Sequence, residues 1–257
     1  MKPETTSVSI VVPVLNEARL IGPFLRHLKT LGSAVEIIVV DGESTDGTLK
    51  LAQPLADRVL SAPRGRAPQM NAGAEIASGE VLWFLHADLR VPANALEEID
   101  AVLRDDRVVG GCFRLRYPRR ERIYRVSDSL GNIGVDLFGF ALGDHGIFCR
   151  RSAFARVGGY PILPILEDGE LYLRLRTVGR MQQLSEEIVS DPRTFERGGR
   201  YRTTAVYFLI LLLYVAGVPV SRLNQIYRRF AGPRPRPCGG DGLSRNASQG
   251  TRESEFG

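Results

Sequence analysis

The chain has 257 residues, of which 44% are hydrophobic and 25% are charged, and its formal net charge is +5. These are ordinary values for a soluble globular protein, so we expect a hydrophobic core large enough to be stable without disulfides or a structural metal. The three cysteines, Cys112, Cys149 and Cys238, have no C-x-x-C spacing. The lack of this spacing argues against a zinc site or a disulfide framework and favours reduced thiols in a cytosolic setting. The basic charge suits an anionic partner such as a sugar nucleotide, a membrane surface or a nucleic acid.

The first third of the chain alternates short apolar runs with helical patterns. Residues 1–7 are polar and the apolar run after them is short and contains Pro13, so no signal peptide is expected. Buried strands are predicted at residues 8–14, 35–40, 58–60 and 81–85, and helices at residues 17–31, before about residue 52, and at residues 68–77. This alternation predicts an α/β fold with a mainly parallel, Rossmann-like sheet flanked by helices. Ligands bind such sheets at the carboxyl ends of the strands.

The second half of the chain is less regular. Helices are predicted at residues 93–103, 152–157, 167–178 and 221–230, a strand at residues 108–117, and a loop-rich cover at the glycine-rich residues 131–146. From residue 232 onward Pro, Gly, Arg and Ser dominate, which is typical of disorder. We therefore expect a main domain (1–200), C-terminal apolar and basic helices (201–231) and a disordered tail (232–257).

Polar motifs stand where three of the predicted strands end. Asn16 and Glu17 follow the first strand and can bond a base or ribose, or can begin a helix. Asp41 ends the second strand and can accept from a uracil or ribose, or can close an Asx-turn. His86 and Asp88 follow the fourth strand. These side chains are expected to share one edge of the sheet.

A glycine between two arginines precedes the third predicted helix. The run Arg64-Gly65-Arg66 leads into a helix start, an arrangement that suits a diphosphate. Gln69 and Asn71 follow in the same stretch. A surface loop with solvated arginines is the alternative.

The order of these motifs resembles the family-2 glycosyltransferases with the GT-A fold, over nearly all of residues 8–230. The details are most similar to small bacterial glycosyltransferases associated with arsenosugar biosynthesis, and more loosely to a carotenoid-acid glycosyltransferase. The resemblance implies an inverting transferase that moves a sugar from a nucleoside-diphosphate sugar to an acceptor hydroxyl or carboxylate. It implies that the nucleotide site contains Pro13, Asn16, Glu17, Asp41, Arg64, Gly65, Gln69, Asn71 and His86.

The resemblance also implies a divalent cation, Mg²⁺ or Mn²⁺, and a catalytic base. In the family an Asp-x-Asp element holds the cation; Asp88 matches its last acid, whereas His86 replaces the first. Glu167 and Asp168 open a predicted helix at the matching distance, which implies that this pair is catalytic and that Asp168 is the base. Neighbouring carboxylates can raise each other's pKa, which suits a base. The alternative is that both acids only complement the helix dipole.

Two further polar groups are weighed as site residues. Asp144 and His145 lie in a glycine-rich run that shapes the acceptor pocket in the family, and a solvated surface turn is the alternative. Arg193, Glu196 and Arg197 stand where related enzymes hold basic residues near the leaving diphosphate, and a solvated charged loop is the alternative.

Residues 205–220 contain no charged side chain and have arginines on both sides. Three interpretations stay open: a core or homodimer-interface helix, an interfacial helix facing anionic lipid, or a membrane span. The expected partners are a sugar nucleotide, provisionally a UDP-sugar, and a small-molecule or lipid-like acceptor. The expected location is cytoplasmic, with peripheral contact to the cytoplasmic face of the membrane as an option. No nucleic-acid recognition motif is present, so nucleic acid is not expected.

Two other functions remain open at this point. A sugar nucleotidyltransferase shares the first half of the fold, but its glycine-rich, arginine-bearing signature after the first strand is replaced here by Pro13-Val14-Leu15-Asn16. A non-catalytic module that binds sugar nucleotides or associates with membranes is the second, and His86 in place of an acid is the feature that supports it.

Overall fold

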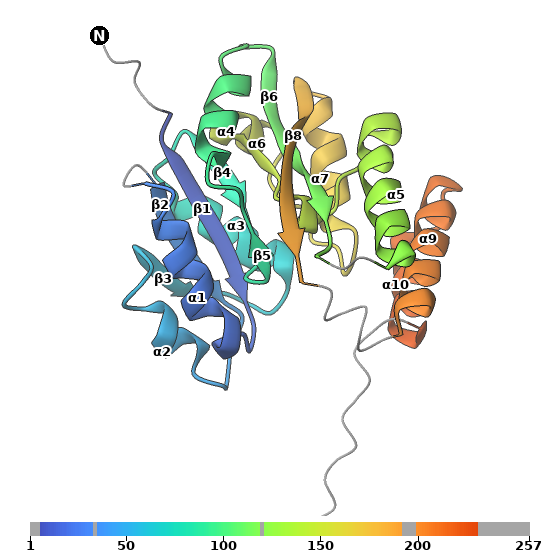
Figure 1. The fold of residues 1–257 in the computed structure, drawn as a ribbon, viewed down its shortest axis with the longest axis horizontal. Coiled ribbons are helices and arrows are strands. Elements are labelled where there is room, and N and C mark those ends of the chain that lie inside the picture. The colour runs from blue at the N-terminus through green and yellow to red at the C-terminus, as the bar shows by residue number, and fades with distance from the viewer. Residues whose placement is uncertain (1–5, 33–34, 119–120, 192–198, 231–257) are drawn as a thin grey trace, which may run out of the picture.

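The computed structural model describes residues 6–32, 35–118, 121–191 and 199–230. Its centre is one eight-stranded sheet with the strand order β3-β2-β1-β4-β7-β6-β8-β5 (Figure 1). The strands are β1 (Val8–Val14), β2 (Val35–Asp41), β3 (Arg58–Ser61), β4 (Val81–Phe84), β5 (Leu89–Arg90), β6 (Val108–Arg116), β7 (Phe148–Arg150) and β8 (Arg180–Ser190). The first four strands pair in parallel. β7 is antiparallel to both of its neighbours, β5 is antiparallel to β8, and β6 and β8 are parallel.

The helices cover both faces of this sheet. They are α1 (Ala18–Lys29), α2 (Thr48–Ala52), α3 (Arg66–Ile76), α4 (Ala95–Leu103), α5 (Arg122–Phe138), the 3₁₀ turn η1 (Gly143–His145), α6 (Arg151–Arg156), α7 (Glu167–Arg176), α9 (Arg200–Val215) and α10 (Val220–Phe230). Side chains of α1, α2 and α4 pack into one core cluster, and side chains of α3, α6 and α7 pack into a second. Alternate residues of β1 contribute to each cluster, because successive side chains of a strand point to opposite faces.

Most of the predicted elements are confirmed, with boundaries that move by a few residues. The expectation of a mainly parallel sheet holds for the half that contains β1 to β4, whereas the other half is mixed. The strands β5, β7 and β8 were not predicted. The eleven residues of β8 alternate short apolar and polar stretches without a clear period, so only the pairing with β6 reveals the strand.

The loop-rich cover predicted at residues 131–146 is wrong for residues 131–138, whereas residues 139–146 form a loop with one short 3₁₀ turn. Residues up to Phe138 belong to the 17-residue helix α5, in which Gly131 and Gly134 are interior positions. Tertiary contacts outweigh the low helix propensity of glycine here. Asn132 is buried, and its amide accepts from the Leu115 N–H at 2.8 Å and donates to the Leu115 carbonyl at 3.0 Å. These two bonds dock α5 beside β6.

The C-terminal helices form a pair that packs beside α5. Contacts join α9 to α10 and α9 to α5, and the three helices lie together beyond β8 (Figure 1). In the described part of the chain, no helix combines the length and the apolar character needed to cross a bilayer. The predicted tail at residues 232–257 lies outside the described residues, and the division at residue 200 stays a prediction.

Candidate active site

The loops after β1 and β2 are joined by hydrogen bonds between themselves. Asn16 adopts a left-handed conformation with φ of 57°, and its Oδ1 accepts from the Thr45 backbone N–H at 2.8 Å. The Asn16 N–H in turn donates to Ser44 Oγ at 2.9 Å, and the Glu17 N–H donates to Thr48 Oγ1 at 2.8 Å. The two loops therefore form one rigid rim at the carboxyl edge of the sheet, where ligands of parallel sheets bind.

Only one of the two carboxylate oxygens of Asp41 accepts a hydrogen bond within the described structure. The side chain is buried, and its Oδ2 accepts from the Ser44 N–H at 2.9 Å. Its Oδ1 is also buried, and no hydrogen-bond donor reaches it within the described structure. A buried acceptor that lacks a donor is costly, so this oxygen is suited to a donor from a ligand. Pro13, by contrast, is a buried residue inside β1.

Arg64 and Gly65 lie at the start of α3, on the same edge. The Arg64 guanidinium is exposed; it donates to the Gly42 carbonyl at 3.3 Å and lies 3.7 Å from the Glu43 carboxylate. Gly65 has φ of 133°, a conformation that L-residues rarely adopt, and it precedes the first turn of the helix. The helix N-terminus with two arginines beside it is an arrangement that attracts an anion.

Gln69 and Asn71, which were predicted to lie in the nucleotide site, make structural hydrogen bonds. Gln69 is buried, and its Nε2 donates to the carbonyls of Val14 at 2.9 Å and Val40 at 2.7 Å. The Asn71 amide pairs with the backbone of Tyr160, donating at 2.9 Å and accepting at 2.8 Å. Both side chains bond to backbone groups of other segments, so they hold α3 in place.

Asp168 is held in the first turn of α7 by an unusual backbone. Leu166, just before the helix, has φ of 64°, which is strained for a residue with a branched side chain. The turn directs Glu167 and Asp168 inward, where both are buried. Burial raises the pKa of Asp168, the neighbouring Glu167 raises it further and Arg66 lowers it, with a result of about 7.

Arg66 faces both of these acids. Its Nε lies 3.6 Å from a Glu167 oxygen and its NH1 lies 3.7 Å from Asp168 Oδ2. Although burial lowers the pKa of Arg66, Glu167 and Asp168 raise it above its usual value. The arginine is therefore a permanent cation between the start of α3 and the start of α7.

His86 and Asp168 both closely approach the backbone of Gly143. A Cβ built on Gly143 would lie 2.4 Å from His86 Nε2 and 2.5 Å from Asp168 Oδ2. His86 Nε2 and Asp168 Oδ1 are buried without a hydrogen-bond partner among the described residues. Burial lowers the pKa of His86 to about 4, with a further contribution from Arg66, so its imidazole is neutral at pH 7. Any side chain at Gly143 would collide with both groups, so only glycine permits their close approach.

Asp144 and His145, the two residues of η1 considered for acceptor contacts, differ in their surroundings. Asp144 is half-buried, and its Oδ2 accepts from the hydroxyls of Tyr117 and Ser190, each at 3.5 Å. His145 is buried in the core, with Nδ1 3.1 Å from the Phe113 carbonyl. The structure thus makes His145 a core residue, which corrects its expected acceptor contact, and leaves Asp144 beside the site.

A comparison of sequences identifies the family. The sequence model of the family described as "Glycosyl transferase family 2" matches residues 9–157. The chain belongs to glycosyl transferase family 2. The match ends before α7, so the interpretation of Asp168 rests on its own geometry.

Curated relatives of this family member include two undecaprenyl-phosphate 4-deoxy-4-formamido-L-arabinose transferases. That of Pseudomonas paraeruginosa is 31% identical over 164 residues, which cover 58% of this chain and 47% of the relative. That of Klebsiella pneumoniae is 27% identical over 168 residues, covering 60% and 50%. The chain spans about half the length of the curated relatives it matches.

Solved structures show that this family member has the GT-A fold. A mannosyltransferase from Pyrobaculum calidifontis, in complex with GDP-Man and Mn²⁺, superposes with a TM-score of 0.62 at 21% identity, covering 90% of this chain and 72% of that chain. Glucosyl-3-phosphoglycerate synthase from Mycobacterium tuberculosis, in complex with Mn²⁺, UDP and its product, gives 0.58 at 20% identity, covering 83% and 81%. The finer resemblance to arsenosugar enzymes stays a prediction.

Asp88 and His86, which follow β4, carry groups of the kinds that bind divalent cations. Asp88 is half-buried and supplies a carboxylate, and the unpartnered nitrogen of His86 supplies a neutral imidazole. Imidazole suits transition metals such as Mn²⁺, and carboxylate suits both Mn²⁺ and Mg²⁺. Across the described ranges, no group of three His, Cys, Asp or Glu side chains is arranged around one point. Donor phosphates and water would have to complete the coordination.

The contacts of Arg66 with the two acids of α7 could not be predicted from the sequence. Arg66 was noted beside Gly65 for a diphosphate, but its contacts with Glu167 and Asp168 span about 100 positions of sequence and only folding brings them together. Tyr160 was not considered, yet its buried hydroxyl, unpaired in the described structure, is close enough to Asp168 for each to affect the other's pKa. Arg193, Glu196 and Arg197 lie outside the described residues.

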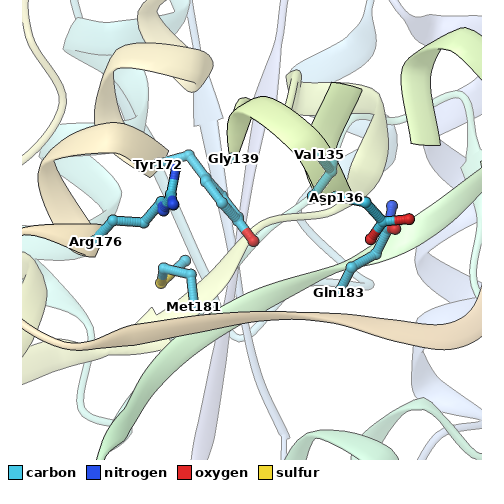
Figure 2. A pocket seen from close by; sticks show the side chains of 7 residues that line it. All are labelled: Val135, Asp136, Gly139, Tyr172, Arg176, Met181 and Gln183. Atoms are coloured by element: carbon cyan, nitrogen blue, oxygen red, sulfur yellow. The ribbon is translucent and has the colours of Figure 1, made fainter. Parts of the chain in front are cut away.

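A separate cavity of about 160 Å³ lies between α5, α7 and β8 (Figure 2). Figure 2 shows the polar ends of Asp136 and Gln183 together on one side, with Arg176 on the other. The lining residues are Val135, Asp136, Gly139, Tyr172, Arg176, Met181 and Gln183. None of these residues belongs to the predicted site.

Proposed function

We propose that this family member is an inverting glycosyltransferase that moves a sugar from a nucleoside-diphosphate sugar to an acceptor hydroxyl, with Asp168 as the base. The observation that carries the proposal is the environment of Asp168. Its carboxylate is buried, has a pKa of about 7, and lies with His86 against the backbone of Gly143. A general base works best when its pKa is close to the operating pH.

In the proposed reaction the acceptor oxygen bonds to the anomeric carbon of the donor while its proton passes to Asp168. The bond from that carbon to the diphosphate breaks, and the electron pair leaves with the nucleoside diphosphate. Attack from the face opposite the leaving group inverts the anomeric centre. Glu167 acts as a positioning residue, because it holds Arg66 and raises the pKa of Asp168.

The donor half of the site is proposed to contain the free oxygen of Asp41, the rim at Asn16 and Glu17, and the arginines beside Gly65. Asp41 Oδ1 would accept from the base or ribose, and Arg64 and Arg66 would neutralise the diphosphate at the start of α3. Asp88 and His86 would hold a Mg²⁺ or Mn²⁺ ion, which supplies charge neutralisation for the leaving diphosphate. Uracil is the proposed base.

A lipid-like acceptor is proposed, because both curated relatives are named as undecaprenyl-phosphate 4-deoxy-4-formamido-L-arabinose transferases. An acceptor hydroxyl needs a base, whereas a phosphate acceptor is already an anion at neutral pH. A base with the raised pKa of Asp168 would serve an acceptor that presents a hydroxyl group. Buried free cysteines, Cys112 and Cys149, are compatible with a cytoplasmic location.

The decisive experiment compares donor binding and turnover in the wild type and in Asp168→Asn. Calorimetry with UDP, GDP and dTDP, each with and without Mn²⁺, should give tight, metal-dependent binding of one nucleotide in both proteins. Asp88→Ala should weaken that binding. The wild type should hydrolyse or transfer the sugar of the matching sugar nucleotide, whereas Asp168→Asn should bind the nucleotide but lose this activity.

Other outcomes would favour the other functions. Metal-dependent binding without turnover of any sugar nucleotide, in the presence of lipid acceptors, would favour a non-catalytic sugar-nucleotide module. Release of pyrophosphate from a nucleoside triphosphate and a sugar phosphate would identify a nucleotidyltransferase. Failure to bind all three nucleotides would contradict the proposal.

A further inference from the structure

Helix α5 presents a stripe of apolar side chains to solvent. Val126, Leu130, Ile133 and Leu137 are all exposed, and Leu137 reaches 71%. Their spacing of four, three and four residues places them on one side of the helix. The acids of α5 are engaged elsewhere, since Asp128 accepts from the Tyr117 N–H and Asp136 pairs with Arg114.

Helix α9 presents a second apolar stripe. Phe208, Leu212 and Val215 are exposed, with Val215 at 65%, and they follow the same helical spacing. The opposite side of α9 is buried, because Val206 and Ile210 pack against Leu223 of α10. α9 contacts α5 (Figure 1), so the two stripes belong to one region of the molecule, named here the α5–α9 surface.

An exposed apolar region of this kind marks an interaction site in a soluble protein. The charges of α9 and of α10, which packs on α9, indicate which partner the surface takes. Residues 200–230 contain five arginines and no acid. Arg202, Arg222, Arg228 and Arg229 are exposed, and the guanidinium groups of Arg202 and Arg229 lie 6.0 and 5.7 Å from the centre of the Phe230 ring.

We propose that the α5–α9 surface docks on an anionic lipid bilayer, with its leucines in the interface and its arginines against the lipid phosphates. An interfacial helix buries its apolar side while basic residues contact anionic headgroups. A second copy of the chain is a poorer occupant, since a symmetric contact would bring the arginines of the two copies together. This inference does not require the proposed transfer reaction.

Docking in this way would place the candidate active site beside the membrane. The inner side of α9 contacts α7, where the Tyr214 hydroxyl donates to Glu170, two residues after Asp168. Leu142, which precedes Gly143, is itself exposed. A lipid-linked acceptor would then approach Asp168 without leaving the bilayer.

The test is sedimentation of the full chain with vesicles, without any substrate. Vesicles of phosphatidylcholine that contain phosphatidylglycerol should bind the protein, and pure phosphatidylcholine should bind it much less. Leu137→Ser with Leu212→Ser should lower the partition coefficient by roughly tenfold or more, because two inserted leucines are lost. Arg222→Gln and Arg228→Gln should each lower it about fivefold at low salt.

Matched controls lie elsewhere on the molecule. Leu51 on α2 is 46% exposed and Arg156 at the end of α6 is exposed, so Leu51→Ser and Arg156→Gln should leave vesicle binding unchanged. Equal losses in the controls, or equal binding to both vesicle types, would overturn the proposal. So would a dimer in analytical ultracentrifugation that Leu137→Ser converts to a monomer, because the surface would then be an interface between copies. Loss of sugar transfer with intact vesicle binding would concern the proposed function alone.

Discussion

The two halves of the candidate site differ in how their polar groups are satisfied. On the donor side Asn16, Gln69 and Asn71 use their amides to tie the backbone together. On the acceptor side Asp168 Oδ1 is buried, as is His86 Nε2 where the two sides meet, and nothing in the described part of the chain pairs with either atom. The exception on the donor side is Asp41, with one free oxygen.

This difference separates residues that hold the site together from residues whose polar atoms can still bind a ligand. A buried polar atom without a partner costs about 1–3 kcal/mol, so a fold keeps such atoms where a ligand can satisfy them. Substitutions on the two sides should consequently have different readouts. On the acceptor side they should change the rate and its pH dependence, and on the donor side, at the amides, they should change stability.

The largest effect is expected for Asp168→Asn. Loss of the base should reduce kcat by roughly 10²–10⁴-fold, the usual contribution of general base catalysis, with nucleotide affinity nearly unchanged. Steady-state kinetics with the donor identified by calorimetry would measure it. Retention of near wild-type kcat would remove Asp168 from the mechanism.

Gly143→Ala should come next. Its new Cβ would lie 2.4 Å from His86 Nε2 and 2.5 Å from Asp168 Oδ2, so both side chains must move. A displacement of about 1 Å at a reacting group can reduce the rate by about 10²-fold. The control is Gly134→Ala in α5, where a Cβ meets no atom of the described structure within 4 Å. Gly134→Ala should keep full activity. Equal activity in Gly134→Ala and Gly143→Ala would show that the positions of His86 and Asp168 beside Gly143 do not matter for the reaction.

Gln69→Leu tests the structural role of the donor-side amides. The change leaves the buried carbonyls of Val14 and Val40 without their shared donor, which should lower the free energy of unfolding by about 1–3 kcal/mol. Urea denaturation would measure the loss. The pH profile of the remaining folded enzyme should keep its wild-type midpoint, and a shifted midpoint would contradict the separation of the two sides.

The pH profile itself should respond to Arg66. Because the pKa of Asp168 is raised to about 7, its carboxyl is protonated and inactive below that pH, and kcat/KM should rise as the pH passes 7. Arg66 lowers this pKa, so Arg66→Gln should move the rise to higher pH, by up to about one unit. A midpoint that stays in place would mean that the observed titration belongs to another group.

The amino-acid sequence by itself determined the donor half of the fold. The runs at β1, β2 and β4 are apolar and β-branched, and the helices between them have clear spacing, so local pattern and final structure agree. The motifs at Asn16, Asp41 and Asp88 follow directly from the strand ends. Family membership could be inferred from the same residues.

Only the tertiary structure decided the rest. Gly131 and Gly134 predict a loop by propensity, but docking of Asn132 on Leu115 keeps them in a helix. Gln69 has the same local sequence whether it faces a nucleotide or the carbonyls of two strands, and the packing of α3 selects the carbonyls. The pKa of Asp168 depends on burial and on Arg66, a residue distant in sequence, because electrostatic interactions follow distance in space.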